Sequence, residues 1–323
     1  MKEAILHIAI ENFQKTTGLN ICLEEDRPLD GVIRMDLPKR KLRFTIECKN
    51  ELRGHQLHQL QELHAKYNSF MLVANRIFPR EKEELRTMGI PYLEANGNVF
   101  IKDEHTFIFI DTRKNFIQTK EKGNRAFTKT GLKVLLHLLQ NKEDINLPQR
   151  ELAKITNVGL GTIPQVIEGL KDTGYLLQVK GKQYIWEKRR DLLDRWITEY
   201  DTVLKPKLKK ERYHYNGAWE NLAFNNELTV WGGEPAADIL TNYLRPEKFI
   251  IYTKENRLSL MKNYRLLPKK DGEIEVLELF WQQNKNREIA PEILVYAELL
   301  LEGGKRNKET AERIFNEYIE PRL

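Results

Sequence analysis

Residues 149–186 read QRELAKITNVGLGTIPQVIEGLKDTGYLLQVKGKQYIW, and their pattern decides the fold of the middle of the chain. Apolar residues recur at helical spacing on both sides of a short turn, and Gly174 is placed to stop the second helix. A final apolar run folds back around Lys180-Gly181-Lys182. The stretch therefore predicts four elements in order: a helix over 148–156, a turn at 157–159, a helix over 161–173 and a hairpin over 175–187.

A further helix is predicted immediately before this stretch. Residues 130–140 read TGLKVLLHLLQ and carry leucines at helical spacing. Three helices followed by a hairpin with a lysine-containing tip resemble a winged helix-turn-helix domain. In such domains the second helix packs on the third, and the start of the third helix enters the major groove.

This resemblance implies two kinds of DNA contact. Thr162 and Gln165 lie at the start of the third helix and are the candidates for base edges, since glutamine can bond adenine through two hydrogen bonds. Contacts to phosphate position a domain without reading sequence, and four lysines are expected to make them: Lys154, Lys171, Lys180 and Lys182. Binding of this kind requires no cofactor.

Pro164 is unusual inside a recognition helix, because proline removes a backbone hydrogen bond unless it lies in the first turn. The third helix is therefore expected either to begin late, near Ile163, or to be distorted at its start. A winged helix can also serve protein packing, so a structural adaptor remains an alternative to a DNA-binding domain.

The positive charge of the chain is concentrated in the same region. The 323 residues carry a net charge of +6. Residues 121–215 hold 19 Lys and Arg against 12 Asp and Glu, whereas residues 216–323 hold 15 against 18. Only the middle third has a strong electrostatic reason to bind a polyanion such as double-stranded DNA.

Composition excludes several classes of protein. Two cysteines, Cys22 and Cys48, are too few for a disulfide scaffold or a four-cysteine zinc site. No run approaches the ~18 apolar residues of a membrane span, and the first residues lack a signal-peptide pattern. We therefore expect a cytoplasmic protein without a membrane partner. His55 and His58 have helical i,i+3 spacing, but no other ligand completes a metal set with them.

Strands and helices alternate in the first part of the chain, which predicts an α/β fold with a mixed sheet. The polar run TKEKGNR at 119–125 is a predicted linker. We therefore expect three domains: an α/β domain over 1–120, an all-α winged helix over 126–190, and an α+β domain over 191–323.

The first domain is expected to contain a hairpin of chemical interest. Strands over 29–37 and 42–50 flank Pro38-Lys39-Arg40-Lys41. A loop centred on Lys39 and Arg40 pairs Leu37 with Leu42. In that register Asp30 lies opposite Lys49, whereas a three-residue loop would turn Asp30 to the other face.

Because alternate residues share a face, Glu47 and Lys49 then lie beside Asp30. Two carboxylates can hold Mg²⁺, which would activate a water for attack on a phosphodiester, and a lysine can stabilise the developing charge. The arrangement resembles the PD-(D/E)XK nuclease superfamily and its restriction-endonuclease-like fold. The resemblance implies catalytic roles for Asp30, Glu47 and Lys49, with Asp30 and Glu47 as metal ligands. A nuclease-like fold without activity, and ordinary ion pairs on a strand edge, remain alternatives.

The last third of the chain contains two distinctive segments. Residues 231–246 read WGGEPAADILTNYLRP, and residues 295–314 read VYAELLLEGGKRNKETAERI. Together with the preceding domains, they resemble the AbiEi-type antitoxins of type IV toxin–antitoxin systems in bacteria. The resemblance implies a regulator that binds its own promoter, and a nucleotidyltransferase-like toxin opposed by function rather than by a tight complex. About 125 residues precede the winged helix here, whereas known members have that domain at the N-terminus.

Overall fold

The chain divides into two compact units, Met1–Lys120 and Glu121–Leu323. The structure, a computed structural model, describes most of the chain. The residues described are 2–24, 29–38, 40–52, 54–111, 124–179, 181, 183–208, 210–283 and 287–323, without the side chain of His55.

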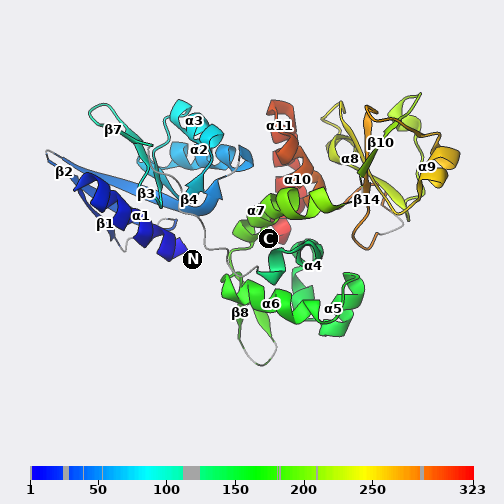
Figure 1. Cartoon of the computed structure of the whole chain (residues 1–323), viewed down its shortest axis with the longest axis horizontal. Coiled ribbons are helices and arrows are strands. Elements are labelled where there is room, and N and C mark those ends of the chain that lie inside the picture. The colour runs from blue at the N-terminus through cyan, green and yellow to red at the C-terminus, as the bar shows by residue number, and fades with distance from the viewer. Residues whose placement is uncertain are drawn as a thin grey trace. The chain divides into compact units, whose positions relative to one another are not determined.

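A seven-stranded sheet forms the centre of the first unit (Figure 1). The strands neighbour one another in chain order: β1 (Asn20–Glu24), β2 (Val32–Leu37), β3 (Arg40–Leu52), β4 (Phe70–Ile77), β5 (Tyr92–Glu94), β6 (Val99–Lys102) and β7 (Phe107–Ile110). Strands β3, β4 and β5 run parallel, and the remaining pairs are antiparallel. The predicted α/β character and mixed sheet of this unit are confirmed.

Three helices cover the sheet, with α1 on one face and α2 and α3 on the other (Figure 1). They are α1 (Lys2–Thr17), α2 (Leu57–Lys66) and α3 (Pro79–Thr87). Apolar side chains of α1 cluster with Ile46 and Cys48 of β3, whereas Leu72 of β4 clusters with α2 and α3. Because side chains alternate along a strand, Glu47 and Lys49 point away from the α1 cluster.

The register of the β2–β3 hairpin differs from the prediction. Leu37 pairs with Arg40, and Leu42 pairs with Met35. Only two residues connect the strands, because the backbone pairing continues two residues further than expected, as in the tightest hairpins. A shift of two residues preserves which side chains share a face, so the displacement does not turn Asp30 away from Glu47.

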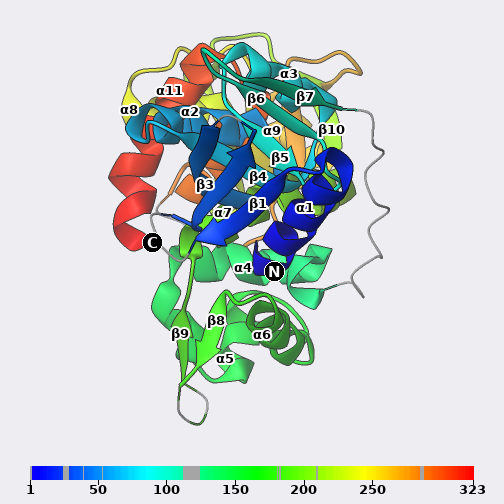
Figure 2. The ribbon, with the colours of Figure 1, turned by 90° about the vertical axis from the view of Figure 1, so that its left-hand side faces the viewer.

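The second unit begins with three helices and a two-stranded sheet (Figure 2). These elements are α4 (Lys129–Gln140), α5 (Gln149–Ile155), α6 (Thr162–Asp172), β8 (Leu176–Gln178) and β9 (Tyr184–Trp186). Helix α6 begins at Thr162, which places Pro164 in its first turn. Backbone N–H groups of the first turn have no intrahelical partner, so the proline costs no helical hydrogen bond there. The helix thus begins within one residue of Ile163, as the first of the two predicted alternatives required, and it continues unbroken to Asp172.

Among the described residues, the rest of the second unit combines a five-stranded sheet with five α-helices. The strands are β10 (Lys210–His214), β11 (Thr229–Gly232), β12 (Phe249–Thr253), β13 (Leu267–Pro268) and β14 (Ile274–Glu278), in the order β11-β12-β14-β10-β13. The helices are α7 (Arg189–Glu199), α8 (Gly233–Thr241), α9 (Arg257–Tyr264), α10 (Glu292–Glu302) and α11 (Lys305–Ile314). One hydrophobic cluster runs from Ala126 to Ile319, through both parts of the unit. The predicted division near residue 190 stays a prediction.

Helix α7 connects the two parts of this unit through polar contacts as well as apolar ones. The Arg189 guanidinium donates to the carbonyl oxygens of Leu138 and Leu139 at the end of α4, at 3.3 and 2.9 Å. Burial lowers the pKa of Arg189 to about 10. Further along α7, the indole N–H of Trp196 donates to the Leu132 carbonyl of α4 at 2.9 Å.

Candidate nucleic-acid interface and candidate metal centre

Helix α6 buries one face and exposes the other. Ile163, Val166 and Leu170 are fully buried, whereas Gln165 is exposed and Thr162 half-buried. The buried face packs on α4 and α5, so the start of α6 presents polar side chains outward. This is the face that the sequence assigned to base contact.

A glycine and an asparagine set the position of α6. The Asn124 side chain donates to the Gly169 carbonyl at 2.8 Å and accepts from the Ala126 N–H. A Cβ on Gly169 would lie 2.1 Å from Asn124 Oδ1, so this helical glycine permits the close approach. Asn124 and Gly169 therefore fix the position of α6 and, with it, the direction of its exposed face.

The lysines predicted to contact phosphate differ in their exposure and in their ion pairing. Lys154 is exposed on α5, and it has no ion-pair partner among the residues that the structure describes. Lys171 is half-buried and pairs with Glu168 at 3.2 Å. Lys180 and Lys182 lie outside the described residues. Lys154 is thus the described lysine of this set that is most available to a phosphate.

Sequence reasoning missed two features of this surface. Glu168 is exposed three residues after Gln165, a spacing that places both on one helix face. Leu177, Val179 and Ile185 of the hairpin are each at least 50 % exposed. Their i,i+2 spacing and the pairing of Leu177 with Ile185 put them on one side of the hairpin. The alternation of these apolar residues is visible in the sequence, but the sequence does not show which side of the hairpin is buried.

The first unit brings Asp30, Glu47 and Lys49 together. Asp30 Oδ2 accepts a hydrogen bond from the Cys48 backbone N–H at 2.8 Å. Lys49 Nζ lies 3.6 Å from Glu47 Oε1. Glu47 and Lys49 are nearly buried, although they are charged. They lie on the part of β3 that continues past its pairing with β2, which starts where Val32 faces Thr45.

Lys2 of α1 also reaches this cluster, which the sequence did not reveal. Its ammonium lies 2.8 Å from Asp30 Oδ2 and 4.0 Å from Glu47 Oε1. A cation is therefore already held between the two carboxylates by the fold itself. Hard oxygen ligands around a positive charge fit the requirements of Mg²⁺, provided that Lys2 moves away.

Cys48 separates Glu47 from Lys49 but does not add a thiolate to the cluster. Its burial, followed by the nearby Asp30 carboxylate, raises the pKa of the thiol to about 12. The thiol is therefore neutral at physiological pH, and a neutral thiol is a poor ligand.

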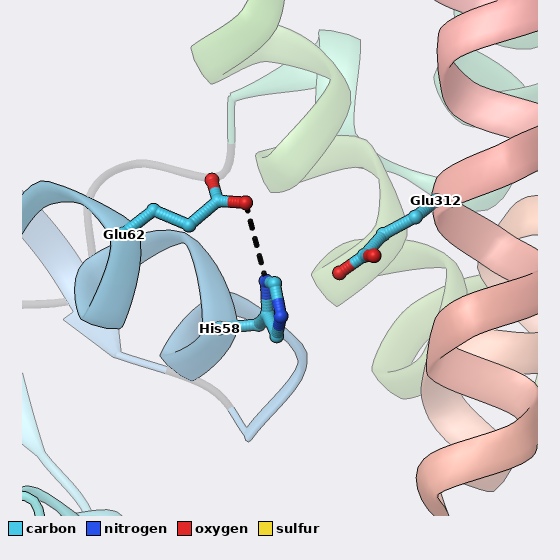
Figure 3. Close-up of side chains that lie close together, drawn as sticks. All are labelled: His58, Glu62 and Glu312. Carbon is cyan, nitrogen blue, oxygen red and sulfur yellow. Dashed lines mark ion pairs between the residues drawn. The ribbon is translucent and has the colours of Figure 1, made fainter.

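The histidine pair considered from the sequence is not brought into a metal set by the described side chains of this unit. His58 Nδ1 lies 3.6 Å from Glu62 Oε1, one helical turn away on α2 (Figure 3). Both side chains are exposed, and the side chain of His55 is outside the described part of the chain. An exposed pair of this kind contributes little to stability.

The two distinctive segments of the last third meet at Glu234. Its Oε2 accepts from the backbone N–H groups of Glu247 and Lys248 at 2.6 and 3.0 Å. Its Oε1 accepts from the Asn307 side-chain amide at 3.1 Å. A single carboxylate thus joins the WGGEP turn, the chain after YLRP and the GGKRN start of α11.

A buried polar network joins Tyr200, which follows α7, to Tyr252 of β12 and Glu298 of α10. Tyr200 and Tyr252 both donate to Glu298 Oε1, at 2.5 and 2.6 Å, while Lys205 pairs with Glu298 Oε2 at 2.6 Å. Burial, followed by Glu298, raises the pKa of both tyrosines, so they remain protonated donors. The network satisfies a carboxylate that would otherwise be costly to bury.

Comparison with known proteins bears on the second unit. Residues 185–320 match a family model of transcriptional regulators. The description of that model is more particular: transcriptional regulator, AbiEi antitoxin, type IV toxin–antitoxin system. The match contains both distinctive segments and extends from β9 to the last helical turn. No curated protein and no solved structure matches the chain. Among the described residues, no helix is long and apolar enough to cross a membrane.

Proposed function

We propose that the chain is a DNA-binding transcriptional regulator and the antitoxin of a type IV toxin–antitoxin system. It binds duplex operator DNA through a winged helix formed by α4, α5, α6 and the β8–β9 hairpin. The observation that carries this proposal is the outward polar face at the start of α6, in the same unit as the family match. The excess of basic residues over 121–215 supports the same function.

The partner in this proposal is a nucleotidyltransferase-like toxin that the regulator opposes by function. The family description names a toxin–antitoxin system, which supports the existence of such a partner. Co-expression with the neighbouring toxin gene tests this part: the chain should restore growth. Continued growth arrest, with both proteins present at normal levels, would contradict antitoxin activity.

Lys154→Ala should weaken binding to all duplex sequences by a similar factor. Lys154 is exposed, and a phosphate contact carries no sequence information. The slope of log affinity against log salt should become shallower by about one. Fluorescence anisotropy with operator and scrambled duplexes at several salt concentrations measures both effects. Lys262→Ala, on α9, is the matched control and should leave the slope unchanged; an unchanged slope for Lys154→Ala would contradict the contact.

Gln165→Ala should relax sequence preference at one base pair of the operator. A bidentate contact from glutamine to adenine contributes about 1–3 kcal/mol of discrimination. A panel of operators with each base pair replaced in turn, measured with both proteins, locates the position. Gln149→Ala, at the start of α5, serves as the control. If the variant discriminates at every position as the unmodified protein does, Gln165 is not a base-reading residue.

A second function is favoured by the geometry of the first unit: metal-dependent phosphodiester cleavage, with the winged helix as the targeting module. The observation behind it is the convergence of Asp30, Glu47 and Lys49. Asp30 and Glu47 would hold Mg²⁺, which supplies an activated water and polarises the phosphate. Lys49 would stabilise negative charge on the phosphate oxygens.

Lys2→Ala should raise the affinity of the first unit for Mn²⁺, because the metal would no longer compete with an ammonium group. The expected gain is several-fold, up to about tenfold, for loss of one partly exposed ion pair. Titration followed by Mn²⁺ electron paramagnetic resonance measures it in the full chain. Lys15→Ala, which removes an exposed lysine from the same helix, should have no effect. Equal Mn²⁺ affinity for Lys2→Ala and the unmodified chain would contradict a shared site.

A further inference from the structure

A cavity of about 430 Å³ lies inside the second unit, between the three-helix part and the sheet part. One wall comes from α4 and the end of α5, and the other comes from the chain after β14. The residues that matter for its chemistry are Lys133, His137, Gln140, Trp281, Gln283 and Arg287. The volume is within the range of small-molecule sites.

We propose that this cavity binds a nucleotide, with the phosphate at Lys133 and the base among the amide side chains and Trp281. The site is separate from both the outward face of α6 and the Asp30 cluster. It would take a free small molecule, in contrast to the duplex DNA bound by the winged helix.

The charge of the cavity favours an anion. Among its described lining residues there are three basic side chains and no carboxylate. In two other cavities of this unit, basic side chains are accompanied by three glutamates: Glu234, Glu247 and Glu302 in one, and Glu211, Glu255 and Glu278 in the other. Carboxylates repel a phosphate, so the cavity without carboxylates among its described lining residues suits such a ligand better than these two.

Lys133 is the basic residue that lacks a partner. His137 pairs with Asp144 at 2.7 Å, and Arg287 pairs with Glu292 at 3.0 Å. Within the described part of the chain, the half-buried Lys133 has no hydrogen-bond or ion-pair partner. Its burial lowers the pKa of the ammonium, partly offset by Glu278. A bound phosphate would supply the missing counter-charge.

The opposite end of the cavity suits a base. Helix α4 ends there, at Gln140. The side-chain amides of Gln140 and Asn141 donate to the Leu136 and His137 carbonyls, and each retains its oxygen as an acceptor for the edge of a base. Lys133 lies about two turns earlier on the same helix, which separates the two ends of the ligand.

Trp281 is held as part of the wall. Its indole N–H donates to Gln283 Oε1 at 2.7 Å, and the Gln283 amide donates to the Arg287 carbonyl at 2.7 Å. The ring also contacts Tyr252 edge to face, at 5.0 Å between centroids. A fixed aromatic ring provides a surface for a planar base, a contact that tolerates different bases.

Isothermal titration calorimetry of the full chain with AMP, GMP, CMP and UMP tests this proposal. The matching nucleosides and inorganic phosphate are separate arms. We expect at least one nucleotide to bind at least about tenfold more tightly than its nucleoside and than phosphate. Lys133→Ala and Trp281→Ala should each weaken that nucleotide at least about tenfold, whereas Lys248→Ala, at another cavity, should not.

The outcomes separate the alternatives. No binding of any of the four nucleotides below about 1 mM would overturn the proposal. Phosphate or nucleoside binding as tightly as the nucleotide would overturn it as well, because the site would then recognise only one part of the ligand. If Lys133→Ala bound the nucleotide as tightly as the unmodified chain does, the assignment of the phosphate to Lys133 would be wrong. Lys133→Met retains the length of the side chain without its charge and separates loss of charge from misfolding, which thermal unfolding of each variant also checks.

Discussion

Trp196→Ala should lower the free energy of unfolding of the second unit by about 3–5 kcal/mol. Trp196 is fully buried and stacks on Tyr200, with 5.2 Å between ring centroids and 10° between planes. Its truncation leaves a large cavity and removes the donor to the Leu132 carbonyl. The effect should extend to the three-helix part, because α4 loses one of its contacts with α7.

Tryptophan fluorescence measures this change selectively. All five tryptophans lie between residues 186 and 281, so a urea titration followed by their emission reports the second unit. Four of them remain in the variant. Leu258→Ala, at a side chain that is 77 % exposed, should change stability by less than about 0.5 kcal/mol. A loss below about 1 kcal/mol for Trp196→Ala would contradict the packing described for α7.

Glu47→Ala and Lys49→Ala should each reduce Mg²⁺- or Mn²⁺-dependent DNA cleavage at least about 100-fold. The first variant removes a metal ligand, and the second removes the cation that stabilises negative charge on the phosphate. Supercoiled plasmid, linear duplex and single-stranded DNA are the substrates, with each metal and with EDTA. Glu62→Ala, at an exposed carboxylate of α2, is the matched control and should retain full activity.

The prediction of metal-dependent cleavage can be wrong even if the chain binds DNA. If the pure chain leaves all three substrates intact with either metal, the nuclease proposal is wrong and the regulator proposal is unaffected. If Glu47→Ala cleaves as fast as the unmodified chain, the activity belongs to another site or to a contaminant.

Local patterns in the sequence predicted the first three helices of the second unit closely. The helix predicted over 161–173 is found at Thr162–Asp172, because Gly174 ends it and its buried residues repeat at helical spacing. The difficulty with Pro164 came from the uncertain start of the helix. Moving that start by one or two residues decides whether the proline is in the first turn, and such boundaries depend on tertiary packing.

The candidate metal centre was predictable in part for a different reason. Strand alternation placed Glu47 and Lys49 on one face, and Asp30 joined them in any register that differed from the predicted one by an even number of residues. The register itself was wrong by two residues, because the turn geometry of a charged loop is not specified by its composition. Lys2 could not be predicted at all, since its approach depends on how α1 lies on the sheet.

Long-range contacts in the last third were beyond sequence reasoning. The meeting of Glu234 with Asn307 joins residues 73 positions apart. The cavity with Lys133 and Arg287 likewise combines segments whose proximity is set by the whole core. Composition showed that this third is acidic, but only the fold separates a cavity without carboxylates from two that contain them.

The central proposal is that the outward face of α6 binds duplex operator DNA, and a gel shift with the chain's own upstream region tests it most directly. The assay is run at low salt, with EDTA in one series and Mg²⁺ in the other, so that binding and nicking are read from one gel. We predict a retarded complex in both series that weakens steeply as salt increases, and that competes poorly with unrelated duplex. Absence of a complex at low salt in both series would contradict the proposal.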